Sequence, residues 1–239
     1  MPDPQTGLHL LVTSLPFILL AYLLGATPTG YWLCLAIKGI DIRQHGSGST
    51  GATNVLRTVG KLPALVVFLV DVGKGSLAVW LTGWLYPMLA PKVLSFLPLA
   101  QETTDVAMAS AVTWLPWLVV CSALMALLGH SKSFWINFTG GKSVATGLGV
   151  LLALDWRVGL MTFALFGLVL AASRIVSLSS IAAAFGVSTL MWLMNPLWAY
   201  RLFTIAGGLY VIYRHSSNIQ RLLAGTEPKL GENPVQKSA

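Results

Sequence analysis

Long apolar runs, separated by short polar segments, cover most of this chain. The runs lie near residues 8–36, 62–86, 106–128, 143–154, 158–173, 178–194 and 198–213. Most of them approach the ~20 residues with which an α-helix crosses the hydrocarbon core of a bilayer. The pattern therefore predicts an all-α, polytopic membrane protein with seven transmembrane helices, folded as a single domain over residues 1–239.

The composition supports this prediction. Hydrophobic residues make up 55% of the 239 residues and charged residues only 10%, whereas a typical soluble domain has about 25% charged residues. Such a chain cannot cover a water-facing surface, which excludes a soluble globular protein and a disordered one. Two cysteines are too few for a disulfide-rich secreted domain. The net charge is +7. The sequence nevertheless contains no basic run with interleaved aromatic residues, so we expect no nucleic-acid partner.

The stretch 143–173 can form one long helix or two short helices that separate at Asp155-Trp156-Arg157. Basic residues accumulate in cytoplasmic loops, and their distribution decides between the two. With two helices and the N-terminus outside, the outer side holds Lys92, Arg157 and Arg201, and the inner side holds Lys38, Arg43, Arg57, Lys61, Lys132, Lys142, Arg174, Arg214, Arg221, Lys229 and Lys237. With one helix the two sides are nearly balanced. We therefore expect two helices, a cytoplasmic C-terminus, and a short segment 143–154 that tilts or crosses only partway.

The first polar segment with a chemical pattern is Gly46–Arg57. Its glycines allow tight turns that direct several backbone N–H groups at one anion. Its hydroxyl and amide side chains add neutral hydrogen bonds, and Arg57 can bind a phosphate in a bidentate manner. The residues concerned are Gly46, Ser47, Gly48, Gly51, Thr53, Asn54 and Arg57. A flexible linker is the plain alternative. The spacing of the glycines also matches a dinucleotide fingerprint, but that motif requires a preceding strand.

The second segment, Gly129–Ser143, ends where an apolar run begins. Gly140, Gly141, Lys142 and Ser143 resemble the end of a P-loop, but Ile136 stands where that motif requires its first glycine, so nucleotide hydrolysis is not expected. A glycine pair, a lysine and a helix start still form an anion site. The plain alternative is that Lys142 only obeys the positive-inside rule.

Two more polar segments follow at the same membrane side. Ser179 and Ser180 lie at the start of the sixth run, where N-capping is the simple interpretation. His215 and Asn218 share a helix face because they are three residues apart, and the basic residues around them could instead contact lipid headgroups. Asp71 and Lys74 lie inside the second run, where we expect a structural ion pair, with a direct role at a site as the alternative.

Together the four segments resemble the bacterial membrane acyl-phosphate:glycerol-3-phosphate acyltransferase (PlsY) family. The residues that carry the resemblance are Gly46–Arg57, Gly129–Thr146, Ser177–Ile181 and His215–Lys229. The resemblance implies transfer of a fatty acyl group from acyl phosphate to the sn-1 hydroxyl of glycerol 3-phosphate. The products would be 1-acyl-glycerol 3-phosphate (lysophosphatidate) and phosphate, in the first step of bacterial phospholipid synthesis.

The same resemblance implies a site on the cytoplasmic face of the bacterial inner membrane, with no cofactor and no metal. Its partners would be glycerol 3-phosphate, acyl phosphate, membrane lipid and the enzyme that makes acyl phosphate. The implied catalytic residues are Ser47, Arg57, Lys142 and His215. The implied substrate-binding residues are Gly46, Gly48, Gly51, Thr53, Asn54, Gly140, Gly141, Ser143, Ser179, Ser180, Asn218 and Glu227.

The chain departs from the family at Ser49, where asparagine is frequent, and in the long interval 87–105. No histidine has an aspartate five residues later, so a His–Asp base of the soluble acyltransferase type is not expected. The resemblance instead suggests that a substrate phosphate takes the hydroxyl proton.

Two other functions are compatible with a membrane protein that has polar segments of this kind. A transporter for a phosphorylated solute would also use helix N-termini and cations, but its groups should lie near the bilayer midplane, where this sequence places only Asp71 and Lys74. A membrane scaffold without activity would tolerate alanine at Ser47, Arg57 and Lys142.

Overall fold

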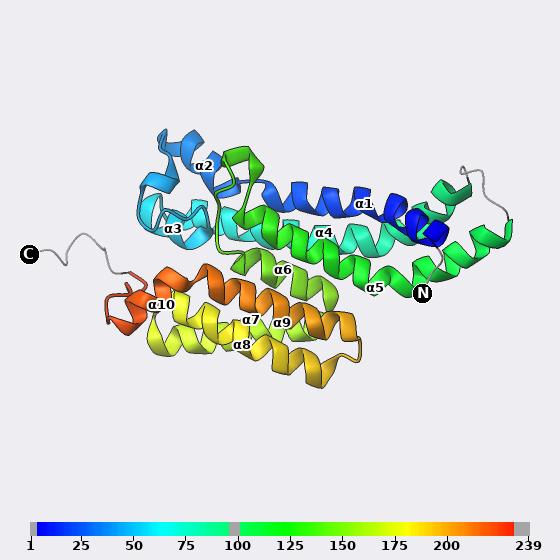
Figure 1. Ribbon diagram of the computed structural model, residues 1–239. Helices are drawn as coiled ribbons and strands as arrows, with labels where there is room; N and C mark the ends of the chain where they lie inside the picture. Colours follow the sequence, from blue (N-terminus) through cyan, green and yellow to red (C-terminus); the bar gives the residue numbers. More distant parts are fainter. Residues whose placement is uncertain (1–3, 96–100, 232–239) are drawn as a thin grey trace, which may run out of the picture.

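The computed structural model describes the backbone of residues 4–95 and 101–231, and within these ranges the chain is helical with no β-strand (Figure 1). The long helices are α1 (Pro4–Ala26), α4 (Lys61–Ser95), α5 (Gln101–Ser131), α6 (Val144–Leu154), α7 (Trp156–Ser173), α8 (Val176–Met194) and α9 (Trp198–Arg214). The shorter elements are α2 (Thr29–Lys38), α3 (Ala52–Thr58), α10 (Ser216–Leu223) and the 3-10 turns η1 (Ile42–Gln44) and η2 (Phe134–Ile136).

The long helices lie side by side in one bundle (Figure 1). The short helices α2, α3 and α10 gather at one end of it, which we call the polar end, whereas α1 begins at the opposite end. In the described part of the chain, five stretches are long and apolar enough to cross a membrane: Leu10–Lys38, Lys61–Ser95, Ala109–Ser131, Trp156–Ser173 and Val176–Met194. Helix α6 is apolar but has only 11 residues, and α9 has 17. The all-α, membrane-type architecture is thus confirmed.

The first apolar run, predicted as one helix over 8–36, is broken in the structure. Helix α1 ends at Ala26 and α2 begins at Thr29. Pro28 explains the break, because proline has no N–H for the helical ladder and its ring clashes with the preceding turn. Two carbonyls exposed by the break find side-chain donors: Lys74 Nζ lies 2.9 Å from Thr27 O, and Ser133 Oγ donates to Ala26 O.

The predicted break within 143–173 is confirmed. Asp155 has an extended backbone, ends α6 and caps α7. Its carboxylate accepts hydrogen bonds from the backbone N of Arg157 at 3.1 Å, from the Arg157 guanidinium at 2.9 Å, and from Asn195 Nδ2 at 3.1 Å. The side chain therefore joins the α6–α7 turn to the α8–α9 turn.

The placement of 87–105 outside the helices was wrong for most of its length. Helix α4 continues to Ser95 despite Pro87 and Pro91, and α5 already begins at Gln101; residues 96–100 lie outside the described residues. Tertiary packing explains the extension, because Tyr86 and Ala90 of α4 are buried against Ala111 and Leu118 of α5. Packing of this kind outweighs the weak local preferences that favoured a loop.

The start of α6 is held against α4 by close backbone contact. A Cβ atom on Gly149 would lie 1.9 Å from Val72 O, and one on Gly75 would lie 2.1 Å from Thr146 O. Ser76 Oγ also donates to Gly149 O at 2.8 Å. Small residues are what allow helices to approach so closely in membranes, and here they fix α6 beside Asp71.

Asp155→Ala should lower the unfolding temperature of the purified protein by about 2–4 °C at neutral pH, because a lost N-cap costs about 1 kcal/mol. The Arg157 hydrogen bond holds the pKa of Asp155 at about 2, well below its ordinary value. The stabilisation is therefore complete above pH ~4 and is lost as the pH falls toward 2. Thermal unfolding at pH 7 and pH 3 should show a smaller difference between parent and variant at pH 3. Asp155→Asn keeps a capping side chain and should lose less; equal unfolding temperatures for all three proteins would contradict the capping role.

Candidate active site

A polar pocket of about 140 Å³ lies at the polar end of the bundle. Its lining joins segments that are far apart in sequence, including most residues that the sequence singled out: Ser47, Gly51, Thr53, Asn54, Arg57, Lys142, Ser143, Ser180, His215, Asn218 and Glu227. The fold thus brings the four predicted segments together at one place.

Helices α6 and α8 begin at this pocket. Val144 and Ala145 at the start of α6 and Val176 and Ser177 at the start of α8 line it. The first N–H groups of a helix have no partner within the helix and carry the positive end of its dipole. The pocket is therefore suited to an anion, as expected for helices that run away from the polar end.

Asn54 organises the turn that precedes α3. Its Nδ2 donates to His45 O and to Ser49 O, both at 2.9 Å, and its Oδ1 accepts from the backbone N of Ser47 at 2.9 Å. The residue is 1% exposed. The amide is used by the backbone of its own segment, so its contribution in this structure is to hold the turn that presents Ser47.

Lys142 is presented by a loop that is fixed on both sides. The backbone N of Gly141 donates to His130 O at 3.1 Å, and Arg214 Nη2 donates to Gly141 O at 3.0 Å. The ammonium of Lys142 donates to Asn218 Oδ1. Burial, together with the positive charge of nearby Arg221, lowers the pKa of Lys142 to about 8. Lys142 is thus a partly desolvated cation next to the N-terminus of α6.

Glu227 ties the C-terminal segment to the pocket. Its carboxylate accepts from Ser177 Oγ at 2.7 Å, from Asn218 Nδ2 at 2.6 Å and from Arg221 Nε at 2.7 Å. Beyond it, Leu230 N donates to Arg174 O at 2.6 Å. The segment after α10 therefore closes one wall of the pocket.

His215 lies at the junction of α9 and α10, where it is 3% exposed. Burial lowers its pKa to about 4, so the ring is neutral at neutral pH. Its Nδ1 lies 2.8 Å from Val211 O. Since a carbonyl only accepts, Nδ1 carries the proton and Nε2 is left as an acceptor.

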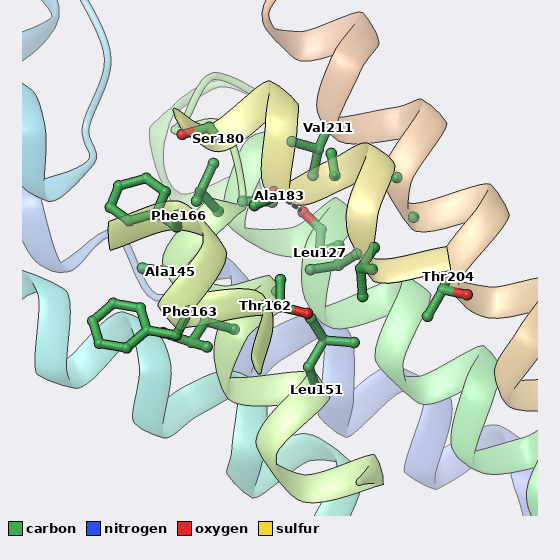
Figure 2. Close-up of a pocket in the computed structure, with 18 of the residues that line it drawn as sticks. Leu127, Ala145, Leu151, Thr162, Phe163, Phe166, Ser180, Ala183, Thr204 and Val211 are labelled. Atoms are coloured by element: carbon green, nitrogen blue, oxygen red, sulfur yellow. Dashed lines mark hydrogen bonds between the residues drawn. The ribbon is translucent and has the colours of Figure 1, made fainter. Parts of the chain in front are cut away.

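An apolar pocket of about 100 Å³ continues from the polar one, among α6, α7, α8 and α9 (Figure 2). Figure 2 shows Phe163 and Phe166 of α7 on one side and Leu127 and Val211 on the other. The two pockets share Phe68, Ser143, Val144, Ala145, Phe166 and Ser180. An amphiphile could therefore place its tail among apolar side chains and its charged head beside Lys142.

A second polar pocket, of about 260 Å³, adjoins the first on the side of α9 and α10. Its lining is Ser47, Gly48, Ser49, Gly140, Lys142, Tyr213, Arg214, Ser216 and Ser217. Ser47, Ser49 and Lys142 belong to both polar pockets. Lys142 thus stands between two spaces of suitable polarity for phosphate groups.

Comparison with known proteins agrees with this arrangement. Residues 15–225 match the profile of the glycerol-3-phosphate acyltransferase family. The chain belongs to this family. It is 55% identical over 217 residues to the glycerol-3-phosphate acyltransferase of Acaryochloris marina, covering 90% of this chain and 91% of that one. It is 50% identical over 222 residues to the enzyme of Trichodesmium erythraeum, covering 93% and 94%.

Solved structures agree as well. The crystal structure of PlsY, an integral membrane glycerol 3-phosphate acyltransferase, in its glycerol 3-phosphate form has a TM-score of 0.76 and 30% identity, over 94% of this chain and 99% of that one. Its lysophosphatidic acid form has a TM-score of 0.73 and 30% identity, over 90% and 94%. The chain is therefore a glycerol-3-phosphate acyltransferase, an integral membrane protein of phospholipid synthesis, and the resemblance stated from the sequence is confirmed.

Some residues expected at the acyltransferase site do not line the polar pocket. Gly48 and Gly140 line the second polar pocket instead. Gly46, Gly141 and Ser179 line none of the three pockets described above. Ser179 Oγ donates to Ile175 O at 2.9 Å within its own helix, which is the back-bonding expected of a serine in a helical turn.

Four further polar residues line the acyltransferase pocket although the resemblance did not imply them as site residues: Ser49, Asp71, His130 and Ser177. Ser177 lies in a segment that was singled out. Asp71 and His130 come from different helices, so no local spacing relates them; the only signal was an ionisable residue within an apolar run.

The pH dependence of kcat/KM should show a falling limb near pH 8, because Lys142 loses its charge there in the free enzyme. Lys142→Arg keeps a side chain that stays charged throughout this pH range, so the limb should move to higher pH even if the rate falls. His215→Gln is the control, because His215 is already neutral in this range. A limb that stays near pH 8 in Lys142→Arg would assign it to another group.

Proposed function

We propose that this acyltransferase takes its acyl group from acyl phosphate and transfers it to the sn-1 hydroxyl of glycerol 3-phosphate. The observation that carries the proposal is the continuity of the apolar pocket with the polar pocket at the start of α6, where Lys142 stands between two polar spaces. An acyl phosphate has a matching shape, with an apolar chain joined directly to a phosphate. The acyl chain lies in the apolar pocket, and the phosphates of donor and acceptor lie in the two polar pockets.

The cations of the site neutralise charge that both substrates bring. Lys142 and Arg57 attract the phosphate groups, and the N-termini of α6 and α8 add oriented N–H groups. Attack on the acyl carbon places negative charge on its oxygen, which the same donors stabilise. Because acyl phosphate is already activated, the protein mainly orients its substrates and neutralises their charge.

The reaction needs no protein base in this proposal. The sn-1 hydroxyl oxygen forms a bond to the acyl carbon, the bond from that carbon to the phosphate oxygen breaks, and a phosphate oxygen takes the hydroxyl proton. The products are the ester and hydrogen phosphate. His215 offers Nε2 as a hydrogen-bond acceptor and so orients a hydroxyl group, with Ser47 and Asn218 at the same pocket.

We also propose seven membrane crossings, in which α1 with α2 forms the first and α4 to α9 form the others. The polar end then faces the cytoplasm of a bacterium, and the chain lies in the inner membrane. This orientation agrees with the excess of basic residues in the segments at that end. It places the site where water-soluble glycerol 3-phosphate and membrane-bound acyl phosphate can both reach it, beside the enzyme that supplies the donor.

Purified enzyme should release phosphate and form lysophosphatidate from palmitoyl phosphate and glycerol 3-phosphate. It should not turn over palmitoyl-CoA. Lys142→Ala should lose at least about a hundredfold in kcat/KM, because a desolvated cation beside the reacting group is removed. Turnover with palmitoyl-CoA but not with palmitoyl phosphate would refute the donor assignment.

Filling the apolar pocket should change chain-length preference. Gly207 lines this pocket, near Leu127 and Phe203, and Gly207→Leu places a branched side chain in the space proposed for the acyl chain. The ratio of kcat/KM for palmitoyl phosphate to that for octanoyl phosphate should fall by about tenfold, since two methylene groups displaced from an apolar pocket have roughly that effect.

Gly167→Leu is the matched control for this experiment. Gly167 lies on α7 with no neighbouring atom within 4 Å of an added Cβ, and it does not line the apolar pocket. Its chain-length ratio should equal that of the parent. An unchanged ratio in Gly207→Leu would show that the acyl chain lies elsewhere.

A further inference from the structure

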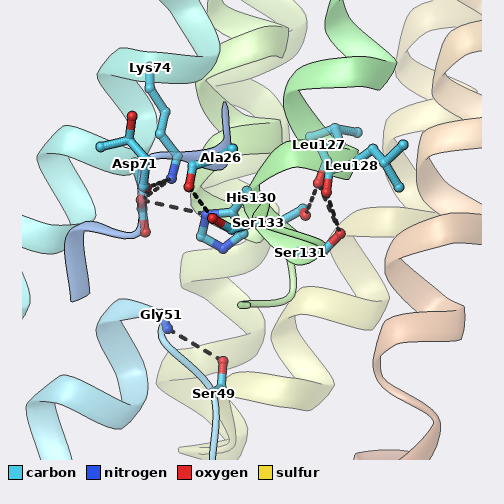
Figure 3. Close-up of polar contacts among 12 residues, drawn as sticks. Ala26, Ser49, Gly51, Asp71, Lys74, Leu127, Leu128, His130, Ser131 and Ser133 are labelled. Atoms are coloured by element: carbon cyan, nitrogen blue, oxygen red, sulfur yellow. Dashed lines mark hydrogen bonds and ion pairs between the residues drawn. The ribbon is translucent and has the colours of Figure 1, made fainter. Parts of the chain in front are cut away.

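Asp71, Lys74 and His130 form a buried ionic cluster (Figure 3), and its histidine contacts Gly141, the residue before Lys142. Asp71 and Lys74 come from α4 and His130 from the end of α5; they are 2%, 7% and 7% exposed. Lys74 Nζ lies 2.8 Å from Asp71 Oδ1, and His130 Nδ1 lies 3.5 Å from the same oxygen. The ion pair expected from the sequence is therefore present, but Asp71 has a second partner that the sequence did not indicate.

Lys74 has a structural task within this cluster. Its ammonium donates to Thr27 O at the break between α1 and α2, in addition to pairing with Asp71. It does not line the polar pocket, whereas Asp71 and His130 do. The carboxylate of Asp71 thus contacts both Lys74, which has a structural task, and His130, which lines the site.

His130 is in direct contact with the loop before Lys142. A Cβ atom on Gly141 would lie 2.1 Å from His130 Nε2, so the backbone of Gly141 lies directly against the imidazole ring. The backbone N of Gly141 also donates to His130 O. On its other side, the loop is held by Arg214. The position of Lys142 therefore depends on where the imidazole ring lies.

We propose that Asp71 and His130 are positioning residues of the acyl-transfer reaction. Asp71, held by Lys74, fixes the His130 ring through Nδ1, and the ring supports Gly141 so that the next residue, Lys142, meets the substrate phosphate. The inference rests on the proposed function in giving Lys142 that substrate. It predicts that loosening the ring reduces kcat/KM without a matching loss of stability.

The test removes the contact to His130 without leaving a buried charge unpaired. Asp71→Leu with Lys74→Met replaces the ion pair by apolar side chains of similar size, a change that many proteins tolerate. Lys74→Met also removes the donor to Thr27 O, so this variant is compared with Asp71→Asn/Lys74→Met, which shares that loss. We expect kcat/KM to fall by about a hundredfold, as a shift of about 1 Å in a reacting group can cause. Asp71→Asn with Lys74→Met keeps an oxygen that accepts from Nδ1 and should recover most of the activity. Asp155→Ala is the control: it removes a buried carboxylate from the α6–α7 turn and should lower the unfolding temperature while kcat/KM stays at the parent value.

A double-mutant cycle tests the contact between ring and loop, even if the ion-pair variants do not fold. Gly141→Ala drives a methyl group into His130, and His130→Ala makes room for it. If the two substitutions acted independently, the kcat/KM of the double variant would be reduced by the product of the two single reductions. We expect its kcat/KM to be at least about fivefold higher than that value. Multiplicative losses, or parent kcat/KM in folded Asp71→Leu/Lys74→Met, would overturn the proposal. All variants are compared with the acyl donor that the parent uses, so a parent inactive with acyl phosphate counts against the donor assignment alone.

Discussion

Where a helix breaks inside an apolar bundle, the backbone N–H and C=O groups at the break need other hydrogen-bond partners. This constraint governs the structure. An unpaired carbonyl or N–H in such surroundings costs several kcal/mol. The chain breaks between α1 and α2 and again before α6, and each break is surrounded by polar side chains: Lys74 and Ser133 at the first, Arg214 at the second. Polar residues that look misplaced in apolar runs are therefore what makes the breaks possible.

The same constraint separates polar groups that build the site from those that remain for substrate. Asn54 uses its amide on the backbone around it, and Glu227 uses its carboxylate on Ser177, Asn218 and Arg221. Within residues 4–95 and 101–231, the ammonium of Lys142 has only Asn218 as a hydrogen-bonding partner. A phosphate can therefore compete for Lys142 at small cost, while the groups that shape the pocket stay fixed.

The sequence was most informative about features that depend on residues close together along the chain. The break at Asp155 could be predicted because only two helices put most basic residues on one side of the membrane. The polar segments could be predicted because their residue types are rare in apolar runs. The break at Pro28 and the extension of α4 through Pro87 could not, because tertiary packing decides whether a proline ends a helix. Proximity between Asp71 and His130 could not be predicted either, since it arises only when α4 and α5 pack together.

The role of Glu227 has a consequence for how the enzyme is made. The pocket takes its first wall from Ser47 and its last from Glu227, and Leu230 is bonded to the α7–α8 turn at Arg174. Helices that enter the membrane one after another during synthesis thus enclose an incomplete pocket until this last segment leaves the ribosome. An unfinished chain would hold its cations beside an open wall, so we expect acyl transfer to begin only after translation has passed the segment that closes the site.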